Sequence, residues 1–307
     1  MAVTNTGIVE RTIVGVNESD LFLDSEATSV TTNTGIVERS IVGVHDANFV
    51  RPLGDELVTD GSFSAEGVEL ATNGDFSNGS TDWTVGTGWS ISDGTAICDG
   101  TNLAYLTQAS IISTGVSYKV QFDIVDYTSG SIKYRDNGLV GGQSFSGVGS
   151  YTDYVVAGGG QFRLMSENFI GSIDNVSVVE VAADWTLGTG WSVSDGVALY
   201  NDSTNSAVLS QAMPIEASKE YKLSFTILNG SGARMQFTDN AGLTLYNLYG
   251  EGNLSDGNYS FVFNTTSTAS GFRLYAYTLS VGQFEIDNIS VKEMLVTRES
   301  TTTNTGI

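Results

Sequence analysis

The sequence predicts an all-β protein, with two tandem antiparallel β-sandwich modules behind an N-terminal arm of repeated β-strands. Gly is abundant, with 36 residues in 307, and Pro is scarce, with 2. Ser, Thr, Asn and Asp fill the gaps between short apolar runs, and these residues tolerate the backbone angles of tight turns. Helical periodicity is nearly absent, and its best candidate, Leu103–Ser110, reads equally well as a strand.

The arm, residues 1–55, contains one motif twice. TNTGIVERTIVGV at Thr4–Val16 returns as TNTGIVERSIVGV at Thr32–Val44, and the tail, residues 296–307, ends on TNTGI. Such a short strand with two apolar faces cannot form a core of its own. We expect it to dock on sibling subunits or a repeating lattice, the alternative being the chain's own modules. The predicted assembly residues are Ile8, Val9, Ile13, Val14, Ile36, Val37, Ile41, Val42 and Ile307.

Two homologous modules follow the arm, at residues 56–181 and 182–295. DWTVGTGWSISDG at Asp82–Gly94 returns as DWTLGTGWSVSDG at Asp184–Gly196, and further matches follow in the same order. In Tyr118–Ile124 every second residue is apolar, and its counterpart in the second copy has the same pattern, which predicts strands with one buried face. Turn signals at short intervals indicate roughly eight strands per module.

The tryptophans and the single cysteine are predicted to be core residues. The Trp pairs bracket a Gly-rich turn at equivalent places in both copies, which favours core anchors over sugar platforms. Cys98 lies in a strand-like apolar run, so we expect it to be buried, and one cysteine excludes an internal disulfide framework. The four tryptophans are Trp83, Trp89, Trp185 and Trp191.

The opening strands occur in an unexpected order. ELVTDGSFS at Glu56–Ser64 is followed at once by its variant ELATNGDFS at Glu69–Ser77, whereas the second module begins directly at Asp184. A sandwich that lacks an edge strand exposes unpaired backbone groups. We infer that Glu56–Ser64 completes the second module, within the chain or in a neighbouring subunit. The alternative is a decayed duplication that lies as a surface loop.

The charge balance excludes two classes of partner. Net charge is −22, with 35 acidic residues against 13 basic ones, so the basic footprint of a nucleic-acid-binding protein is missing. Adhesion to anionic membranes is disfavoured for the same reason. The N-terminus shows no secretion signal, and no apolar stretch is long enough for a membrane helix. We expect synthesis in the cytoplasm and a location on a virion surface or outside the cell after release.

Catalysis is not expected, and neither is a required cofactor. The only histidine, His45, lies in the arm without a matching nucleophile, which excludes His-assisted catalysis and His-rich metal sites. No Gly-rich loop carries the lysine of a P-loop. Carboxylate pairs for glycoside hydrolysis remain open by composition, but the acidic residues sit mostly in turn phrases such as SDG and TDN.

Three phrases carry a resemblance to a known family. NGDFSNGSTDW at Asn73–Trp83, GWSISDG, and the closing IDNVSV resemble the jelly-roll, galactose-binding-like carbohydrate-binding modules appended to glycoside hydrolases. Similar modules occur in bacteriophage tail-fibre and head-decoration proteins. The resemblance covers Glu56 to Met294 and leaves out the arm.

The resemblance implies a structural calcium ion shared by the opening and closing strands. In the first module it points to Glu69, Asp75 and Asp174, and in the second to Glu56 and Asp287. Calcium takes six to eight oxygen ligands, which carboxylates and turn carbonyls can supply. The alternative reading is that these carboxylates accept hydrogen bonds from turn amides.

The resemblance also implies sugar binding by exposed aromatic rings. The sequence does not separate sugar stacking from core packing for the tyrosines. The candidates are Tyr127, Tyr134, Tyr151 and Tyr154 in the first module and Tyr246, Tyr249, Tyr275 and Tyr277 in the second.

These features favour a non-enzymatic virion surface protein, a capsid decoration or fibre subunit of a bacteriophage. In this reading the arm docks on capsid or tail proteins and on other copies of the chain, and the sandwiches project outward. One alternative is a glycan-binding adhesin or receptor-binding tail fibre that contacts host surface glycans. Another is a self-assembling extracellular filament.

Overall fold

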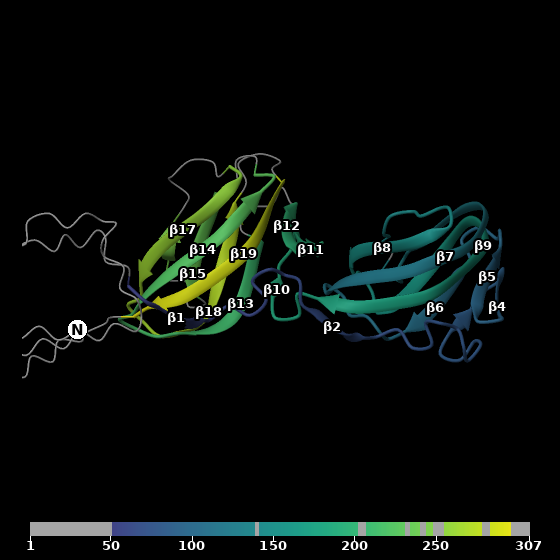
Figure 1. Cartoon of the computed structure of the whole chain (residues 1–307), viewed down its shortest axis with the longest axis horizontal. Helices are drawn as coiled ribbons and strands as arrows, with labels where there is room; N and C mark the ends of the chain where they lie inside the picture. Colours follow the sequence, from purple (N-terminus) through teal and green to yellow (C-terminus); the bar gives the residue numbers. More distant parts are fainter. Residues whose placement is uncertain are drawn as a thin grey trace, which may run out of the picture. The chain divides into compact units, whose positions relative to one another are not determined.

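The computed structural model describes residues 51–138, 141–201, 207–230, 234–239, 244–247, 255–277 and 283–295 (Figure 1). In these ranges all regular elements are β-strands and every strand pairing is antiparallel, so the all-β prediction is confirmed. Among the same residues no helix could span a membrane. The predicted assembly residues of the arm and tail lie outside the described residues.

The first sandwich is built from one eight-stranded sheet that folds over its own core. Its long strands β7 and β9 pair along most of their length, with four register shifts between Gln121 and Ser131. Such bulges bend the strands, so their two halves face each other across the core. The strands are β2 (Glu66–Glu69), β3 (Thr84–Val85), β4 (Trp89–Ser92), β5 (Thr95–Asp99), β6 (Tyr105–Ala109), β7 (Ser117–Tyr134), β8 (Gly149–Val156) and β9 (Gln161–Val181).

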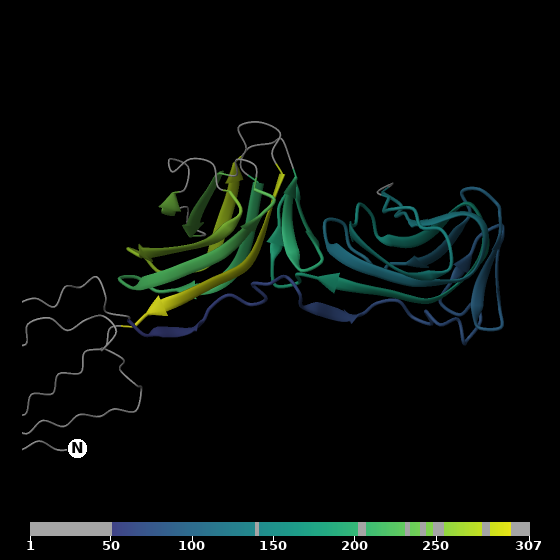
Figure 2. The same cartoon turned by 45° about the horizontal axis from the view of Figure 1, so that its top comes forward.

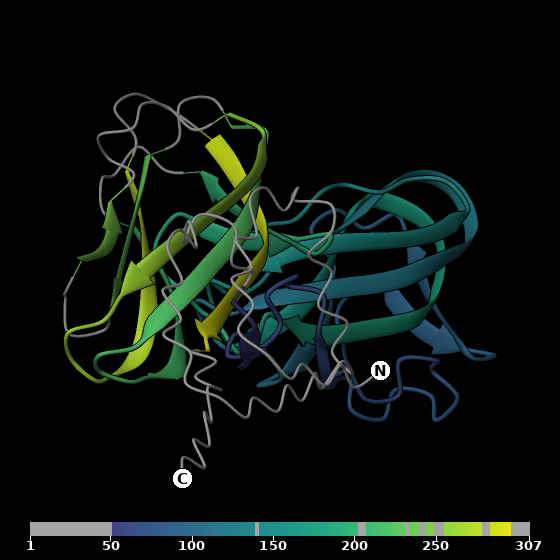
Figure 3. The same ribbon diagram turned by 60° about the vertical axis from the view of Figure 1, so that its left-hand side comes forward.

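The second sandwich has two separate sheets. One contains β1 (Leu53–Glu56), β11 (Trp191–Ser194), β12 (Val197–Asn201), β14 (Glu220–Leu228), β17 (Gly257–Asn264) and β19 (Gln283–Met294). The other contains β10 (Thr186–Leu187), β13 (Ala207–Ile215), β15 (Arg234–Asp239), β16 (Thr244–Asn247) and β18 (Ala269–Tyr277). Figure 3 shows these strands from a second side, green to yellow except for β1, which is purple.

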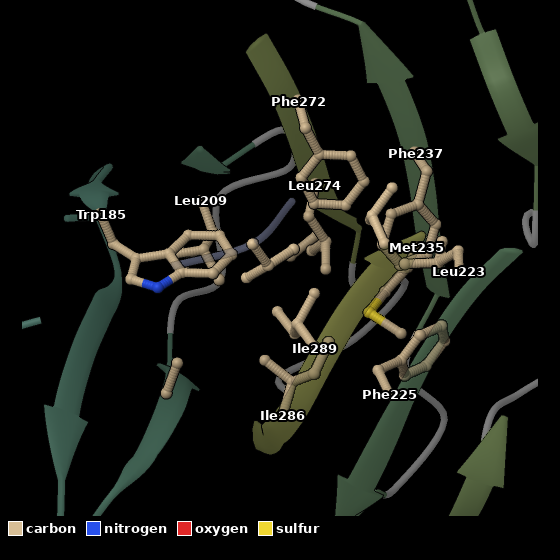
Figure 4. Packing of buried hydrophobic residues seen from close by; sticks show 14 of the residues in the cluster. Trp185, Leu209, Leu223, Phe225, Met235, Phe237, Phe272, Leu274, Ile286 and Ile289 are labelled. Atoms are coloured by element: carbon tan, nitrogen blue, oxygen red, sulfur yellow. The ribbon is translucent and has the colours of Figure 1, made fainter. Parts of the chain in front are cut away.

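Both cores are filled by the alternating apolar residues of facing strands. In the second sandwich Phe225 and Ile286 come from one sheet, and Phe237 and Leu274 come from the other (Figure 4). All four tryptophans are buried, with at most 6% of each side chain exposed, as predicted for core anchors. Cys98 is also buried, as expected.

An opening segment pairs with the last long strand in each sandwich. β1 pairs with β19, and β2 pairs with β9 (Figures 1 and 2). Beyond β1, the Leu57 N–H donates to the Val291 carbonyl at 3.0 Å. Beyond β2, the Leu70 N–H donates to the Val178 carbonyl at 2.9 Å. Residues that precede the first sandwich therefore supply the opening strand of the second.

A buried glutamine binds the backbone of each opening segment. Gln211 accepts the Thr59 N–H at 2.8 Å and donates its amide to the Thr59 carbonyl at 2.6 Å. Gln108 forms the same two bonds with Thr72, at 3.2 and 2.5 Å. The glutamine replaces a neighbouring strand at this point, because it satisfies one residue's backbone donor and acceptor together.

The tryptophans fix the turn that follows. The Trp185 indole N–H donates to the Asp60 carbonyl at 2.9 Å, and its ring centroid lies 5.0 Å from that of Phe63. Trp83 makes the equivalent bond to the Asn73 carbonyl, also at 2.9 Å. Phe63 is 1% exposed, so the opening segment contributes a full aromatic ring to the second core.

Glycine is required where each opening segment crosses its closing strand. A Cβ on Gly61 would lie 1.9 Å from the Ile289 carbonyl oxygen, and one on Gly74 would lie 1.9 Å from that of Val176. In both cases the glycine carbonyl accepts the N–H of that same residue at 2.9 Å. Any larger residue would separate the two backbones.

We predict that Phe63→Ala destabilises the second sandwich by about 3–5 kcal/mol, the usual cost of removing a buried phenylalanine ring. Hydrogen exchange followed by mass spectrometry should show faster exchange in β14 and β19, with β5 and β6 unchanged. The matched variant Phe76→Ala should have the reverse effect, because Phe76 is 1% exposed in the first core. Faster exchange of the first sandwich in Phe63→Ala would contradict the observed pairing.

Candidate functional site

The first predicted calcium ligand, Glu69, is already occupied by protein donors. One carboxylate oxygen accepts the N–H groups of Ala71 and Val178, each at 2.8 Å. The other accepts the Ser177 hydroxyl in a short hydrogen bond. The carboxylate therefore joins the opening segment to β9.

Glu56 does the same in the second sandwich. Its Oε1 accepts the N–H groups of Leu57 and Val58 at 3.1 Å and of Val291 at 2.8 Å. Its Oε2 accepts the Ser290 hydroxyl at 2.6 Å. Hydrogen bonds to a charged acceptor contribute about 1.5–3 kcal/mol each, so this junction is strong in both copies.

The predicted aspartates bond mainly within their own turns. Asp75 accepts the N–H and hydroxyl of Ser77 at 3.2 and 3.0 Å, and these bonds lower the pKa of Asp75. Asp174 accepts the Asn175 N–H at 2.7 Å. Asp287 accepts the backbone and side-chain N–H groups of the following asparagine at 2.6 and 2.8 Å, while burial raises its pKa.

The described residues do not fit the implied calcium site. Among them no group of three or more His, Cys, Asp or Glu side chains could hold a metal ion. Glu69 pairs opposite Val179, which is five residues along β9 from Asp174, or about 16 Å in an extended strand. The arrangement instead matches the alternative reading, in which these carboxylates accept hydrogen bonds from nearby amides.

Tyr134 is not a sugar platform, and the prediction is wrong for this residue. Its side chain is 1% exposed, and its hydroxyl donates to the buried Asp136 at 3.2 Å. Burial, reinforced by the neighbouring carboxylate, raises the pKa of Tyr134 far above its ordinary value. A ring enclosed in this way has no face for a ligand.

The other candidate tyrosines are half-buried or lie outside the description. The Tyr151 hydroxyl donates to the carbonyls of Ser146 and Gly147, and the Tyr127 hydroxyl donates to that of Gly130. These bonds tie both tyrosines to adjacent turns. Tyr154 and Tyr275 are half-buried on β8 and β18, and the side chains of Tyr246, Tyr249 and Tyr277 are outside the described residues.

A different surface combines an aromatic ring with a cation. On β6 and β9 of the first sandwich, the Arg163 guanidinium lies over the Tyr105 ring, 5.2 Å from its centroid. Arg163 also donates to the Gln161 side-chain oxygen in a short hydrogen bond. Leu106 and Phe162 on the same strands point into the core, so strand alternation turns this group outward. We call this outward side of β6, β9 and the end of β7 the Arg163 face.

Glu167 organises the far end of the Arg163 face. Its carboxylate pairs with the Lys133 ammonium and accepts the hydroxyls of Ser131 at 2.9 Å and Ser144 at 2.7 Å. These donors, Lys133 first, lower the pKa of Glu167 to about 2. The face thus presents a fixed carboxylate, an ammonium, a guanidinium and a phenol ring.

The sequence contained a signal for this face that the choice of tyrosines missed. The repeated phrase FRL places an arginine between two core residues in both copies, as Arg163 and Arg273. Alternation turns such an arginine outward, and its repetition marks a position that the duplication kept. The position of Tyr105 is taken by Val208 in the second copy, so the ring and cation pair with this geometry belongs to the first sandwich.

Several of the solved structures that resemble this chain are carbohydrate-binding modules. The tandem CBM22-1–CBM22-2 domain of Paenibacillus barcinonensis Xyn10C is 12% identical, with a TM-score of 0.27, and the match covers 75% of this chain and 99% of that one. A carbohydrate-binding module of family CBM4 is 14% identical, with a TM-score of 0.27, over 36% of this chain and 81% of that one.

The active domain of tailspike protein 4 from bacteriophage CBA120 is 20% identical, with a TM-score of 0.23, over 36% of this chain and 19% of that one. No protein-family model and no curated protein sequence matches the chain. At these identities the similar structures assign no ligand, partner or activity to it.

We predict that the Glu167 cluster stabilises the first sandwich in a pH-dependent way. Because the folded pKa of about 2 lies below the unfolded value, this contribution is complete above about pH 4.5 and is lost as the pH falls toward 2. Glu167→Gln should remove it, so the difference in unfolding free energy from the wild type should shrink on acidification. Urea denaturation at a series of pH values measures this.

Glu285→Gln on β19 serves as the matched control for Glu167→Gln. Because Glu285 lies in the second sandwich, its substitution should leave the pH dependence of the first sandwich's stability unchanged. A constant difference between Glu167→Gln and the wild type from pH 6 to pH 3 would contradict the role given to this carboxylate.

Proposed function

We propose that the chain is a non-enzymatic surface protein whose first sandwich binds a glycan through the Arg163 face. The observation that carries this proposal is the pairing of Tyr105 with Arg163 on an outward strand surface. An aromatic ring packs against the apolar face of a pyranose, and adjacent N–H and O–H groups bond its hydroxyls. The guanidinium covers one face of the half-buried ring and holds it in place, so a sugar would pack against the part of the ring left exposed.

The charges of the Arg163 face favour an acidic sugar over a neutral one. Arginine has five N–H donors in a planar fork that suits a carboxylate, and Gln161 accepts from one of them. Lys133 is paired with Glu167, so Arg163 is the better-placed partner for a ligand carboxylate. We therefore propose a uronic-acid-containing or similarly acidic polysaccharide as ligand class.

The setting we propose is a virion surface, as a capsid decoration or fibre subunit of a bacteriophage. Support comes from the repeated arm motif, which suits repeated equivalent contacts with a lattice. In a receptor-binding fibre the Arg163 face would contact host glycans, and in a decoration protein it would hold the particle near them. A self-assembling extracellular filament is the further candidate, carried by the TNTGI repeat at both ends of the chain.

We predict that Arg163→Ala and Tyr105→Ala each weaken binding to an acidic polysaccharide by about tenfold or more, which equals about 1.4 kcal/mol. Isothermal titration with uronic-acid-containing and neutral polysaccharides measures this. Gln121→Ala is the control, because Gln121 bonds Thr152 on β8, away from β6. Equal binding by all three variants, or no binding by the wild type, would overturn the glycan proposal.

The role of the arm has a separate test. We predict that in dilute solution, where exchange of residues 53–64 is not favoured, the full chain forms trimers or larger assemblies, or binds phage particles, and that a chain lacking residues 1–50 does neither. Native mass and co-sedimentation with particles measure the two outcomes. Equal assembly and particle binding by both chains would contradict the arm's proposed role and leave the Arg163 face unaffected.

A further inference from the structure

Residues 53–64 close the edge of the second sandwich, although they are distant from it in sequence. We call the surface that they cover, along β19 and beside Gln211, the groove of the second sandwich. Residues 53–64 pair with β19, and the whole first sandwich lies between them and β10 in the chain. The core of the second sandwich depends on this segment, since Val58 and Phe63 are part of it. The segment and its groove are therefore two complementary surfaces that are linked only by a long connection.

The groove recognises the segment mainly by features that any copy of it would carry. These are the backbone of Thr59, bound by Gln211, the carboxylate of Glu56, and the glycine at position 61. The first sandwich binds its own opening segment through the same kinds of bonds, with Gln108 as the counterpart of Gln211. The groove therefore recognises features of the segment itself. Whether the segment comes from the same chain or from another copy depends only on how the chain is connected.

The connection after the segment allows it to leave without disturbing the first sandwich. Ala65, Gly67 and Val68 are exposed, with Val68 at 78%. The first sandwich keeps its own opening segment from Glu69 onward and is anchored before it by the Glu66–Lys119 ion pair at 2.7 Å. Among the described residues, the long-range hydrogen bonds of residues 53–64 run to the second sandwich, although Phe63 and Ser64 also line a small pocket with Tyr154 and Val181 of the first.

We propose that the groove of the second sandwich accepts residues 53–64 of a second copy of this chain, so that copies join by exchange of this segment. The exchanged contact reproduces every hydrogen bond of the closed form, because donor and groove are unchanged. The exchanged form is favoured over the closed form when the local concentration of other copies exceeds the effective concentration of the chain's own segment at its groove. Crowding of copies on a surface supplies such a concentration.

The geometry of exchange permits continued growth. The donor is an N-terminal segment, and the acceptor is a groove on the second sandwich, so the contact is heterologous. Such contacts leave a donor at one end and an acceptor at the other, and they propagate unless a ring closes. Exchange would link copies by a route independent of the arm motif.

Single cysteines in two full-length chains test the exchange. Leu53 and Met294 are Cα partners in the β1–β19 pairing, so an exchanged contact holds Leu53→Cys of one tagged chain beside Met294→Cys of the other and favours a mixed disulfide over random collision. The two chains are refolded together in reductant at high concentration and oxidised after folding, when Cys98 is buried. We expect the mixed dimer at about tenfold or more above the control, given millimolar effective concentrations for such linked segments.

The control replaces Leu53→Cys by Val148→Cys, a position 69% exposed in the first sandwich. Adding Gly61→Val to the Leu53→Cys chain should return the yield to the control level, because a side chain there meets the Ile289 carbonyl. A chain with both cysteines should form an internal disulfide at high dilution, and its failure would overturn the pairing itself. A mixed-dimer yield equal to the Val148→Cys control would overturn the exchange.

Discussion

Both sandwiches depend on the junction where a glutamate and the backbone beside it hold an opening segment against a closing strand. Glu56 and Glu69 each accept amide N–H groups from both sides of the junction. These amides are partly buried, and an unpaired amide costs up to about 1–3 kcal/mol, so loss of this carboxylate would weaken the edge of either core. These hydrogen bonds join each opening segment directly to its closing strand.

Much of this fold was predictable because a duplication reveals which residues are structural. The tryptophan pairs and the alternating strands recur in both copies, and the structure buries them in both cores. Two adjacent opening phrases against two bodies led to the interpretation that Glu56–Ser64 completes the second module. In the structure β1 pairs with β19, and Phe63 lies in the second core. The phrase repeats because each core needs one such segment.

The candidate site was less predictable, since a site depends on register and on which face a side chain takes. Tyr134 was predicted as a sugar platform. It lies two residues after the buried Ile132 on the same strand, and residues two apart face the same side, so alternation alone would have placed Tyr134 in the core. Glu69 and Asp174 belong to paired strands, yet the order of residues does not fix where along β9 each pairing falls. Arg163 was visible as a repeated residue, but its contact with Tyr105 required the β6–β9 register.

Net charge sets the conditions under which the Arg163 face would act. A chain of charge −22 repels an acidic polysaccharide at long range, and at 0.1 M salt this repulsion is screened beyond about 10 Å. Contact with an acidic sugar then depends on a cation that bonds directly, which Arg163 supplies from above the Tyr105 ring. Moderate salt therefore screens the long-range repulsion that would slow the encounter with an acidic polysaccharide. Salt weakens the direct arginine contact less than it weakens this repulsion, because the contact would include directional hydrogen bonds and ring packing.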